Sequence, residues 1–276
     1  MIGFEYNGTH SYDVYGIYIK SSNRPILPAL RKREMMISGK HGTYDFGGNT
    51  YDNRIVSVDI AYIGDTLNEF RLHARDIAAW LSQTSYKELI FDDEPDKYYL
   101  AKIYNDIGLE TLYTLGEATV QFECQPFALY QVTSGEDVIL DSDLPLDSDI
   151  LLDPVDAFTV AVTGNTTFAI DYWGTQEVGL GSPDGSKFDI VITGSFTTLS
   201  ITLNGKVINY TTAVASQVIT IDNVNATVKN GTVNKLSDCT GNLDTFLKLI
   251  SGMNIATITG AGLNCSVLFD FRNQYL

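Results

Sequence analysis

The sequence predicts a mainly β protein with two domains, of which the second is a β-sandwich. Short runs of alternating apolar and polar residues recur along the chain, which is typical of strands with one buried face. Gly, Pro, Asn and Asp separate these runs and favour turns. A chain of 276 residues is also long for one core and sufficient for two. We place the first domain at residues 1–133, an acidic linker at 134–157 and the second domain at 158–276.

A β-hairpin is predicted in the first domain. The apolar run Glu88–Phe91 ends in an acidic cluster at residues 92–96, and the aromatic-rich run Tyr98–Ile107 follows. Pro95 cannot donate to a sheet ladder and Asp-rich clusters favour turns, so we expect the turn at 92–96. A third strand follows in which four alternate residues should be buried: Ala118, Val120, Phe122 and Cys124.

One helix is predicted over residues 67–82. Thr66 and Glu69 fit a capping box, in which both side chains satisfy free backbone N–H groups at the start of a helix. Apolar residues then recur three and four positions apart, which indicates one buried face. They are Phe70, Ala74, Ile77, Ala78 and Leu81. We expect this face to pack on a sheet that contains Val56, Val58, Ile60 and Tyr62.

A long connection at residues 23–53 has no core of its own. At about 30 residues it is unusually long for a loop inside a compact domain. It contains apolar residues that favour burial, and an extended hairpin arm lying against a neighbouring subunit would satisfy both facts. The alternative is an unstructured surface loop. The candidate subunit-interface residues are Pro25, Arg31, Lys32, Arg33, Met35, Met36, Ile37 and Tyr44.

The linker carries eight acidic residues and no Lys or Arg between residues 136 and 156. A solvated linker and a bound cation both remain open, although the Gly and Glu of an EF-hand loop are missing. In the second domain, Asn204-Gly205 and Asp184-Gly185 predict turns. Eight strands are predicted there: Phe158–Thr163, Phe168–Tyr172, Phe188–Thr193, Leu199–Leu203, Val207–Tyr210, Val218–Asp222, Ala256–Thr259 and Cys265–Phe271.

Composition argues against several functions. The net charge is −16 and no basic stripe is present, which excludes a DNA-binding domain but suits a channel that lets DNA slide. No apolar run reaches the ~18 residues of a membrane helix, and no secretory signal is visible, so we expect synthesis in the cytoplasm. The three cysteines should be small buried residues. We expect no enzyme activity, cofactor or metal, because His10, His41 and His73 lack zinc-ligand spacing and nucleotide-binding and hydrolase motifs are absent.

The order of motifs resembles the distal tail protein family of long-tailed, non-contractile bacteriophages. The resemblance covers roughly the first 130 residues most clearly. The segments that carry it are Tyr12–Lys20 as the first strand, Asn23–Arg33, Gly39-Lys40-His41-Gly42, Ile55–Ile63, Ala79-Trp80-Leu81, Leu89–Tyr99 and Gly116–Tyr130. Weaker similarity continues at Gln217–Asp222, Val228–Gly231, Ser251–Asn254 and Val267–Leu276, although Ser251 stands where proline is commoner.

The resemblance implies an N-terminal β-sandwich with one helix and an arm, and a galectin-like C-terminal β-sandwich. It implies a structural protein of the virion, at the distal end of the tail. Six copies would form a ring in which each arm clasps the next copy. The ring would join the tail tube protein to the tip or tail-associated lysin and carry receptor-binding or tail-fibre proteins, while DNA passes through its bore.

Two rival functions remain open. One is a carbohydrate-binding module, because Trp173-Gly174 and Glu177 partly match the sugar-binding run of galectins, although the expected Arg is absent. We instead expect Trp173 to be a core or turn residue. The other rival is a glycosidase, which would need two paired carboxylates, but nothing among the 34 acidic residues singles out a pair.

Overall fold

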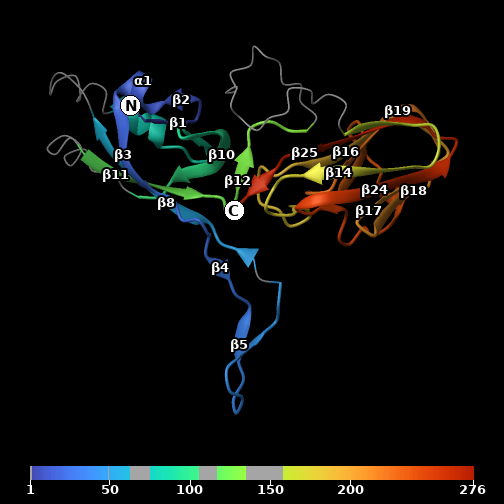
Figure 1. The fold of residues 1–276 in the computed structure, drawn as a ribbon, viewed down its shortest axis with the longest axis horizontal. Helices are drawn as coiled ribbons and strands as arrows, with labels where there is room; N and C mark the ends of the chain where they lie inside the picture. Colours follow the sequence, from blue (N-terminus) through green and yellow to red (C-terminus); the bar gives the residue numbers. More distant parts are fainter. Residues whose placement is uncertain (1, 49, 63–74, 106–116, 135–157) are drawn as a thin grey trace. The chain divides into compact units, whose positions relative to one another are not determined.

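The computed structural model describes residues 2–48, 50–62, 75–105, 117–134 and 158–276 (Figure 1). The chain divides into two compact units, Met1–Ala128 with Leu276, and Leu129–Tyr275. Both units consist mainly of antiparallel strands, which confirms the predicted mainly β class. The predicted capping box, residues 67–74 of the predicted helix and residues 135–157 of the acidic linker lie outside the described residues.

The first unit is built on one antiparallel sheet that curls on itself. Its strands follow the order β2-β1-β9-β10-β11-β8-β3. The Ile19 N–H donates to the Ile2 carbonyl at 2.9 Å, which links the two ends of this order. The strands are β1 (Phe4–Tyr6), β2 (Thr9–His10), β3 (Ile17–Asn23), β8 (Arg54–Tyr62), β9 (Lys87–Phe91), β10 (Glu94–Ile103) and β11 (Glu117–Cys124).

The curling brings strands that are not hydrogen-bonded neighbours into contact across the core. The aromatic rings of Phe4 and Tyr6, on β1, lie 5.7 and 5.3 Å from that of Phe122, on β11. The predicted alternation along β11 is confirmed at three of its four residues, since Val120, Phe122 and Cys124 are buried. Ala118, near the start of the strand, is only half-buried. The two layers of the predicted sandwich therefore come from one continuous sheet.

Residues 75–81 are helical and cover one side of this core. Ile77 and Leu81 are buried as predicted, but Ala78 is exposed. Trp80 is buried in the helix face instead of Ala78. Its ring stacks on that of Phe4 at 5.7 Å, and its Nε1 donates to the Tyr6 carbonyl at 2.7 Å. The large indole reaches β1, whereas the small methyl group of an alanine could not.

The predicted hairpin is present as β9 and β10, but its turn is shorter than expected. Only Asp92 and Asp93 form the turn, and Pro95 lies inside β10. The strand register shifts between Glu94 and Tyr99, which marks a bulge. A bulge interrupts the ladder, so the missing N–H of proline is tolerated there.

The chain before β3 is more structured than the sequence suggested. Residues predicted as part of the first strand instead form a short helix, α1 (Ser11–Tyr15). Gly16, with φ of 64°, ends this helix in the left-handed conformation that glycine adopts most easily. An unpredicted turn at Asn7-Gly8, with φ of 53° and 73°, connects β1 to β2.

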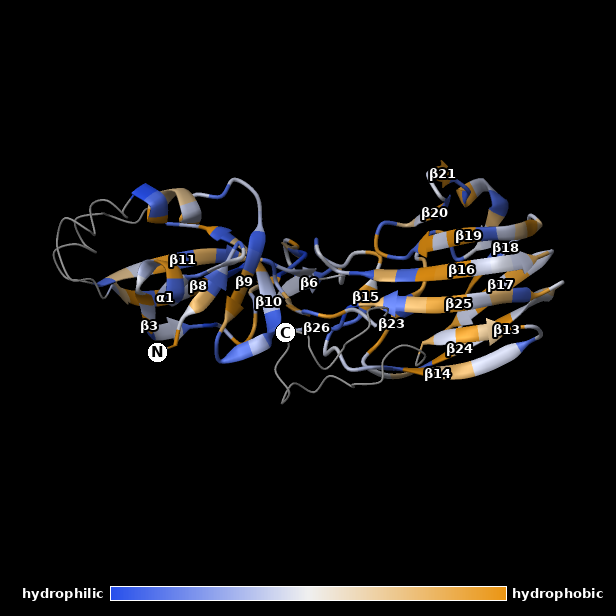
Figure 2. Ribbon diagram, turned by 90° about the horizontal axis from the view of Figure 1, so that it is seen from above, coloured by the Kyte–Doolittle hydropathy of each residue, from blue (hydrophilic) through white to orange (hydrophobic). Residues whose placement is uncertain are grey.

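The second unit is a β-sandwich of a six-stranded and a five-stranded sheet, with strand orders β13-β25-β16-β19-β20-β21 and β14-β24-β17-β18-β22. Hydrophilic and hydrophobic residues alternate along its strands (Figure 2). All eight predicted strands are present: β13 (Thr159–Val162), β14 (Thr166–Tyr172), β16 (Phe188–Phe196), β17 (Thr198–Leu203), β18 (Lys206–Tyr210), β19 (Val214–Asp222), β24 (Gly252–Ala261) and β25 (Asn264–Phe271). The unpredicted strands are β12 (Ala128–Tyr130), β15 (Val178–Gly179), β20 (Thr227–Asn230), β21 (Val233–Asn234), β22 (Cys239–Gly241), β23 (Lys248–Leu249) and β26 (Gln274–Tyr275).

The two sheets of this sandwich share one apolar core. Phe168 on β14 contacts Phe269 on β25 with ring centroids 5.5 Å apart, and both predicted turns are present. Asn204 and Gly205 adopt φ of 50° and 81°, as a tight hairpin turn requires. Asn254 is fully buried, and its amide accepts from the Ile250 N–H at 2.9 Å and donates to the Gly252 carbonyl at 2.8 Å. This asparagine therefore fixes the backbone where the chain enters β24.

Candidate assembly interface on the arm

Residues 24–53 form an extended hairpin that leaves the sheet of the first unit between β3 and β8 (Figure 1). Two short ladders hold it together, β4 (Leu30–Arg31) with β7 (Thr50–Tyr51) and β5 (Glu34–Met36) with β6 (Thr43–Asp45). Backbone N–H groups of Asp52 and Phe46 add bonds to the carbonyls of Ala29 and Arg33, at 2.7 and 2.9 Å. We call this hairpin the arm.

The arm exposes apolar side chains along its length. Ile26 and Met36 are 84% and 83% exposed, far beyond what a core residue shows. Of the large apolar side chains that are exposed among the described residues, eight belong to the arm: Ile26, Leu27, Leu30, Met35, Met36, Ile37, Tyr44 and Phe46. This set, which we call the apolar arm face, includes four of the residues predicted from the sequence to lie at a subunit interface.

A two-stranded hairpin cannot bury these side chains by itself, because it has no second layer. The contacts within the arm are local. Tyr44 and Phe46 meet edge to face at 5.0 Å, and Lys40 Nζ lies 4.9 Å from the centre of the Tyr44 ring. A concentration of exposed apolar surface marks an interaction site in a soluble protein.

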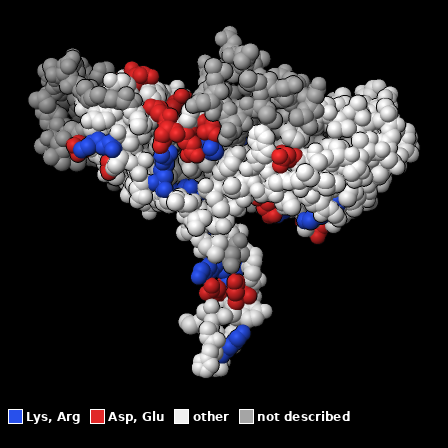
Figure 3. All heavy atoms as spheres, in the orientation of Figure 1, with Lys and Arg blue, Asp and Glu red and all other residues white. Residues whose placement is uncertain are grey.

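Two of the three predicted interface cations, Arg31 and Lys32, have acidic partners within the arm. Arg31 donates to Asp52 at 2.7 Å, and this hydrogen bond holds the pKa of Asp52 below its usual value. Lys32 Nζ lies 3.6 Å from a carboxylate oxygen of Glu34. Figure 3 shows the positive and negative side chains together on the arm. These pairs are exposed to water and contribute little to stability, so a partner could replace them.

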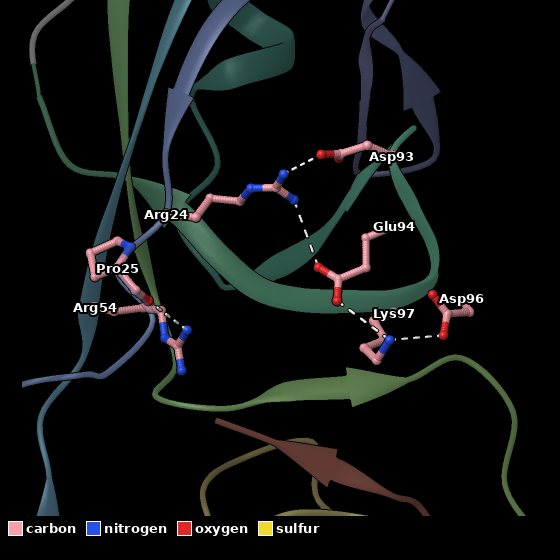
Figure 4. Close-up of polar contacts among 7 residues, drawn as sticks. All are labelled: Arg24, Pro25, Arg54, Asp93, Glu94, Asp96 and Lys97. Atoms are coloured by element: carbon pink, nitrogen blue, oxygen red, sulfur yellow. Dashed lines mark hydrogen bonds and ion pairs between the residues drawn. The ribbon is translucent and has the colours of Figure 1, made fainter. Parts of the chain in front are cut away.

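The arm is fastened at its base, which we call the arm root and define as Arg24, Pro25, Asn53 and Arg54. Arg24 forms an ion pair with Asp93 and lies 3.7 Å from a carboxylate oxygen of Glu94 (Figure 4). Its guanidinium also lies 4.7 Å from the centre of the Phe91 ring. The outgoing strand is thereby tied to the β9–β10 turn.

Arg54 fixes the backbone at the same place from inside the sheet. It is only 3% exposed, donates to the Pro25 carbonyl at 3.2 Å and donates to the Pro126 carbonyl. Its guanidinium lies 5.5 Å from the centre of the Tyr99 ring. Burial lowers the pKa of this guanidinium from its ordinary value. The predicted interface residue Pro25 therefore contributes a carbonyl to the arm root.

The returning strand is tied down as well. The Asn53 amide donates to the Tyr86 hydroxyl at 3.0 Å and to Glu123 at 2.7 Å. The hydrogen bond from Asn53 to Glu123 is the main cause of the lowered pKa of Glu123. Glu123 also pairs with Lys102 at 3.1 Å.

The histidines and the Trp173 region are the other residues considered from the sequence as candidate sites. His10 bonds to Asp92 at 3.0 Å, His41 is exposed on the arm, and His73 lies outside the described residues. Trp173 is 43% exposed in the loop after β14, where its Nε1 donates to Asp171 at 3.0 Å. The nearby Glu177 is paired with Lys248 at 2.5 Å.

The three cysteines are buried and free, as predicted, and burial raises the pKa of the Cys124 thiol to about 12. Within the described ranges, no group of three or more His, Cys, Asp or Glu side chains could hold a metal ion. Nor does that part of the chain contain a helix with the length and apolar character needed to cross a membrane.

Comparison with known proteins defines the class. Residues 13–124 match the family model of the phage tail protein RIFT-related domain, a segment that includes the arm and its root. Residues 13–124 are therefore similar to this phage tail domain, and the similarity supports a structural role in a phage tail.

A particular solved structure matches over the full length. The fold is similar to that of the SPP1 Dit protein (gp 19.1), with a TM-score of 0.68, 14% identity and complete coverage of both chains. That protein is described as a paradigm of the hub adsorption apparatus in phages that infect Gram-positive bacteria. The resemblance to the distal tail protein family is confirmed.

Two structures of the phage p2 baseplate in its activated conformation, with Sr and with Ca, also match. Their TM-scores are 0.45 and 0.43, with 11% identity over 99% of this chain and 98% of the other. The comparison with curated proteins gives no match.

Proposed function

We propose that the protein is a distal tail protein that assembles into a closed ring of six copies at the end of a phage tail. Each arm lies on the neighbouring copy and buries its apolar face there. The ring joins the tail tube to the baseplate or tip. The domain match at residues 13–124 and the full-length fold similarity to a hub protein support this proposal.

The exposure of the apolar arm face is the observation that carries the proposal. Met35, Met36 and Ile37 are exposed in the single chain although their apolar character favours burial. A second copy offers an occupant whose geometry repeats around a closed ring, and closure satisfies every arm at once. Arg31 and Lys32 would then exchange Asp52 and Glu34 for acidic groups on the neighbour, which Arg33 would also face.

The second unit projects from the ring and serves as a hub for receptor-binding or tail-fibre proteins, while the tail-associated lysin or tip protein binds below. The tape measure and then DNA pass through the bore. A net charge of −16 suits this passage, because an acidic wall repels phosphate and does not bind DNA. The role is one of assembly, without catalysis.

The location can be tested by immunogold labelling of intact phage particles with antibodies against the chain. Label at the far end of the tail supports the proposal. Label on the head, along the whole tail or on no particle contradicts it. Negative-stain images of the purified protein complete the test, since the proposal requires closed rings with a central opening.

A second candidate function is carbohydrate binding by the second unit. The exposed Trp173 favours it, because aromatic rings with one polar atom are frequent at binding surfaces. The pairing of Glu177 with Lys248 counts against it, since this carboxylate is already occupied. Binding of the full chain to a cell-wall glycan array, lost in Trp173→Ala, would support this candidate.

A further inference from the structure

The arm root contains more buried and paired polar groups than a connection to a surface loop needs. Arg24 contacts Asp93, Asn53 contacts Glu123, and Arg54 connects the Pro25 carbonyl to the Pro126 carbonyl. Figure 4 shows the contacts of Arg24 and the bond between Arg54 and Pro25. Beyond the root, the side chains of the arm are mostly exposed. The hairpin is therefore fastened firmly at one end and open to water along the rest.

Arg54 is the most informative residue of the root. A guanidinium that is 97% removed from water needs compensation, and a carboxylate would be the strongest partner. Among the described residues its Nε has no hydrogen-bond partner, and its two terminal nitrogens donate to uncharged carbonyls. An apolar side chain would fill the same volume without this desolvation cost. What Arg54 adds is a fixed fork that ties Pro25 to Pro126.

Arg24 and Asn53 act on the two sides of the hairpin. Arg24 draws the outgoing strand toward the acidic β9–β10 turn through Asp93 and Glu94. Asn53 holds the returning strand against Glu123 on β11. Three independent attachments to different strands restrict rotation of the arm about its base, whereas one would leave a hinge.

We propose that Arg54, Arg24 and Asn53 are positioning residues that fix the direction of the arm before any partner binds. The inference rests on the proposed function, in which the arm must reach a defined place on the next copy. Pre-organisation lowers the conformational entropy lost on association, and the gain recurs at every interface of a ring.

The length of the arm makes its root critical. The ~14 residues from Pro25 to Gly39 span up to ~45 Å at about 3.3 Å per residue. A rotation of about 10° at the root would therefore displace the tip by roughly 8 Å, more than the spacing of neighbouring strands. Such an error would prevent the apolar arm face from meeting a fixed surface.

Spin labels on the full chain test this directly. Ser38→Cys at the arm tip and Ser85→Cys on the body of the first unit are both exposed, whereas the native cysteines are buried. Electron paramagnetic resonance then reports the distribution of tip-to-body distances. The measurement uses a chain with Ile26→Ser and Met36→Ser, so that no neighbour holds the arm.

We expect a narrow distribution with the native root. Arg54→Met should broaden it by about twofold, and Arg24→Gln or Asn53→Ala by a smaller factor, because each frees one attachment. Lys20→Gln is the matched control, since Lys20 on β3 pairs with Glu117 on β11 and neither residue belongs to the arm root. It should leave the width unchanged, and all folded variants should melt within a few degrees of the parent.

Unchanged widths in Arg24→Gln and Arg54→Met would overturn the inference, as would equal broadening in Lys20→Gln. If Arg54→Met fails to fold, Arg24→Gln and Asn53→Ala decide. The readout does not require a ring, so it separates the two claims. A chain that never assembles but has a rigid arm contradicts only the proposed function. A chain that forms rings with a loose arm contradicts only the inference.

Discussion

The second unit and the arm use the same strand chemistry with opposite results. In the second unit, two sheets face each other and bury their apolar side chains to near zero exposure, as Ile190, Ile201 and Phe269 illustrate. In the arm, a single hairpin has no facing layer, so Met36 and Ile26 remain in water. The second unit therefore builds its core within one chain, whereas we propose that the arm buries its apolar side chains on another copy.

The largest effect should follow from opening the core of the complete unit. Phe269→Ala removes a fully buried ring that contacts Phe168 on the opposite sheet, and should destabilise the second unit by about 3–5 kcal/mol. Calorimetry of the full chain would show this as a lowered transition. If the arm is independent of that core, the variant should still form rings at low temperature. Loss of ring formation together with the lowered transition would contradict this independence.

Replacement of apolar residues on the arm should do the reverse. Ile26→Ser with Met36→Ser should weaken association by roughly 10²–10⁴-fold, because each buried side chain contributes about 1.5–3 kcal/mol. The melting temperature of the single chain should hardly change, since both residues are already exposed. Val233→Ser, at another exposed apolar residue, is the control. Sedimentation at several concentrations measures the association constant. Equal association constants in the arm variant and in Val233→Ser would refute the role of the arm.

Charge reversal sharpens the comparison at the same surface. Changing Arg31, Lys32 and Arg33 to Glu should weaken ring formation on the order of tenfold, and the loss should shrink as salt rises. Static light scattering gives the mass. A full ring from the triple variant at low salt would show that these cations do not face the neighbour.

The smallest effect concerns a carboxylate inside the second unit. Asp189 lies opposite Asp222 and Asp270 on the adjacent strands, with Lys187 and Lys229 as the nearby cations. Burial, and then Asp222, raise the pKa of Asp189 from 3.8 to about 6. The folded chain therefore holds this proton at a higher pH than the unfolded chain. The contribution of Asp189 to the free energy of unfolding is therefore fully present below pH ~4 and is lost as the pH rises to ~6.

Asp189→Asn removes this fall. At pH 7.5 the variant should be more stable by on the order of 1 kcal/mol, after allowance for partial exposure of the carboxylate. At pH 4 the difference should vanish. Urea unfolding at the two pH values measures it, and a gain that does not depend on pH would contradict the assignment.

The sequence predicts the second unit well because its strands obey one rule. Alternation with period two predicts the strands at Val218–Asp222 and Cys265–Phe271, and Asn204-Gly205 predicts the turn between β17 and β18. The same rule fails for Pro95, because a bulge admits proline into a strand where the ladder is interrupted. It also fails at Ser11–Tyr15, where one helical turn is too short to establish a period.

The arm could also be predicted from the sequence, whereas its root could not. The length and apolar residues of the arm are visible in the sequence, so its candidate interface could be proposed. The contacts of the root could not be predicted, because Arg24 pairs with residues about 70 positions away in the sequence. One signal was present, since Arg54 is in phase with the buried residues Val56, Val58 and Ile60. A charged residue at a buried position of a strand indicates a structural or functional demand.

The mass of the purified full chain in solution, measured by sedimentation as concentration rises, tests the central claim most directly. The account predicts a closed assembly of six copies that falls apart into single chains when Ile26 and Met36 are replaced by serine. A native protein that remains a single copy at high concentration would contradict it.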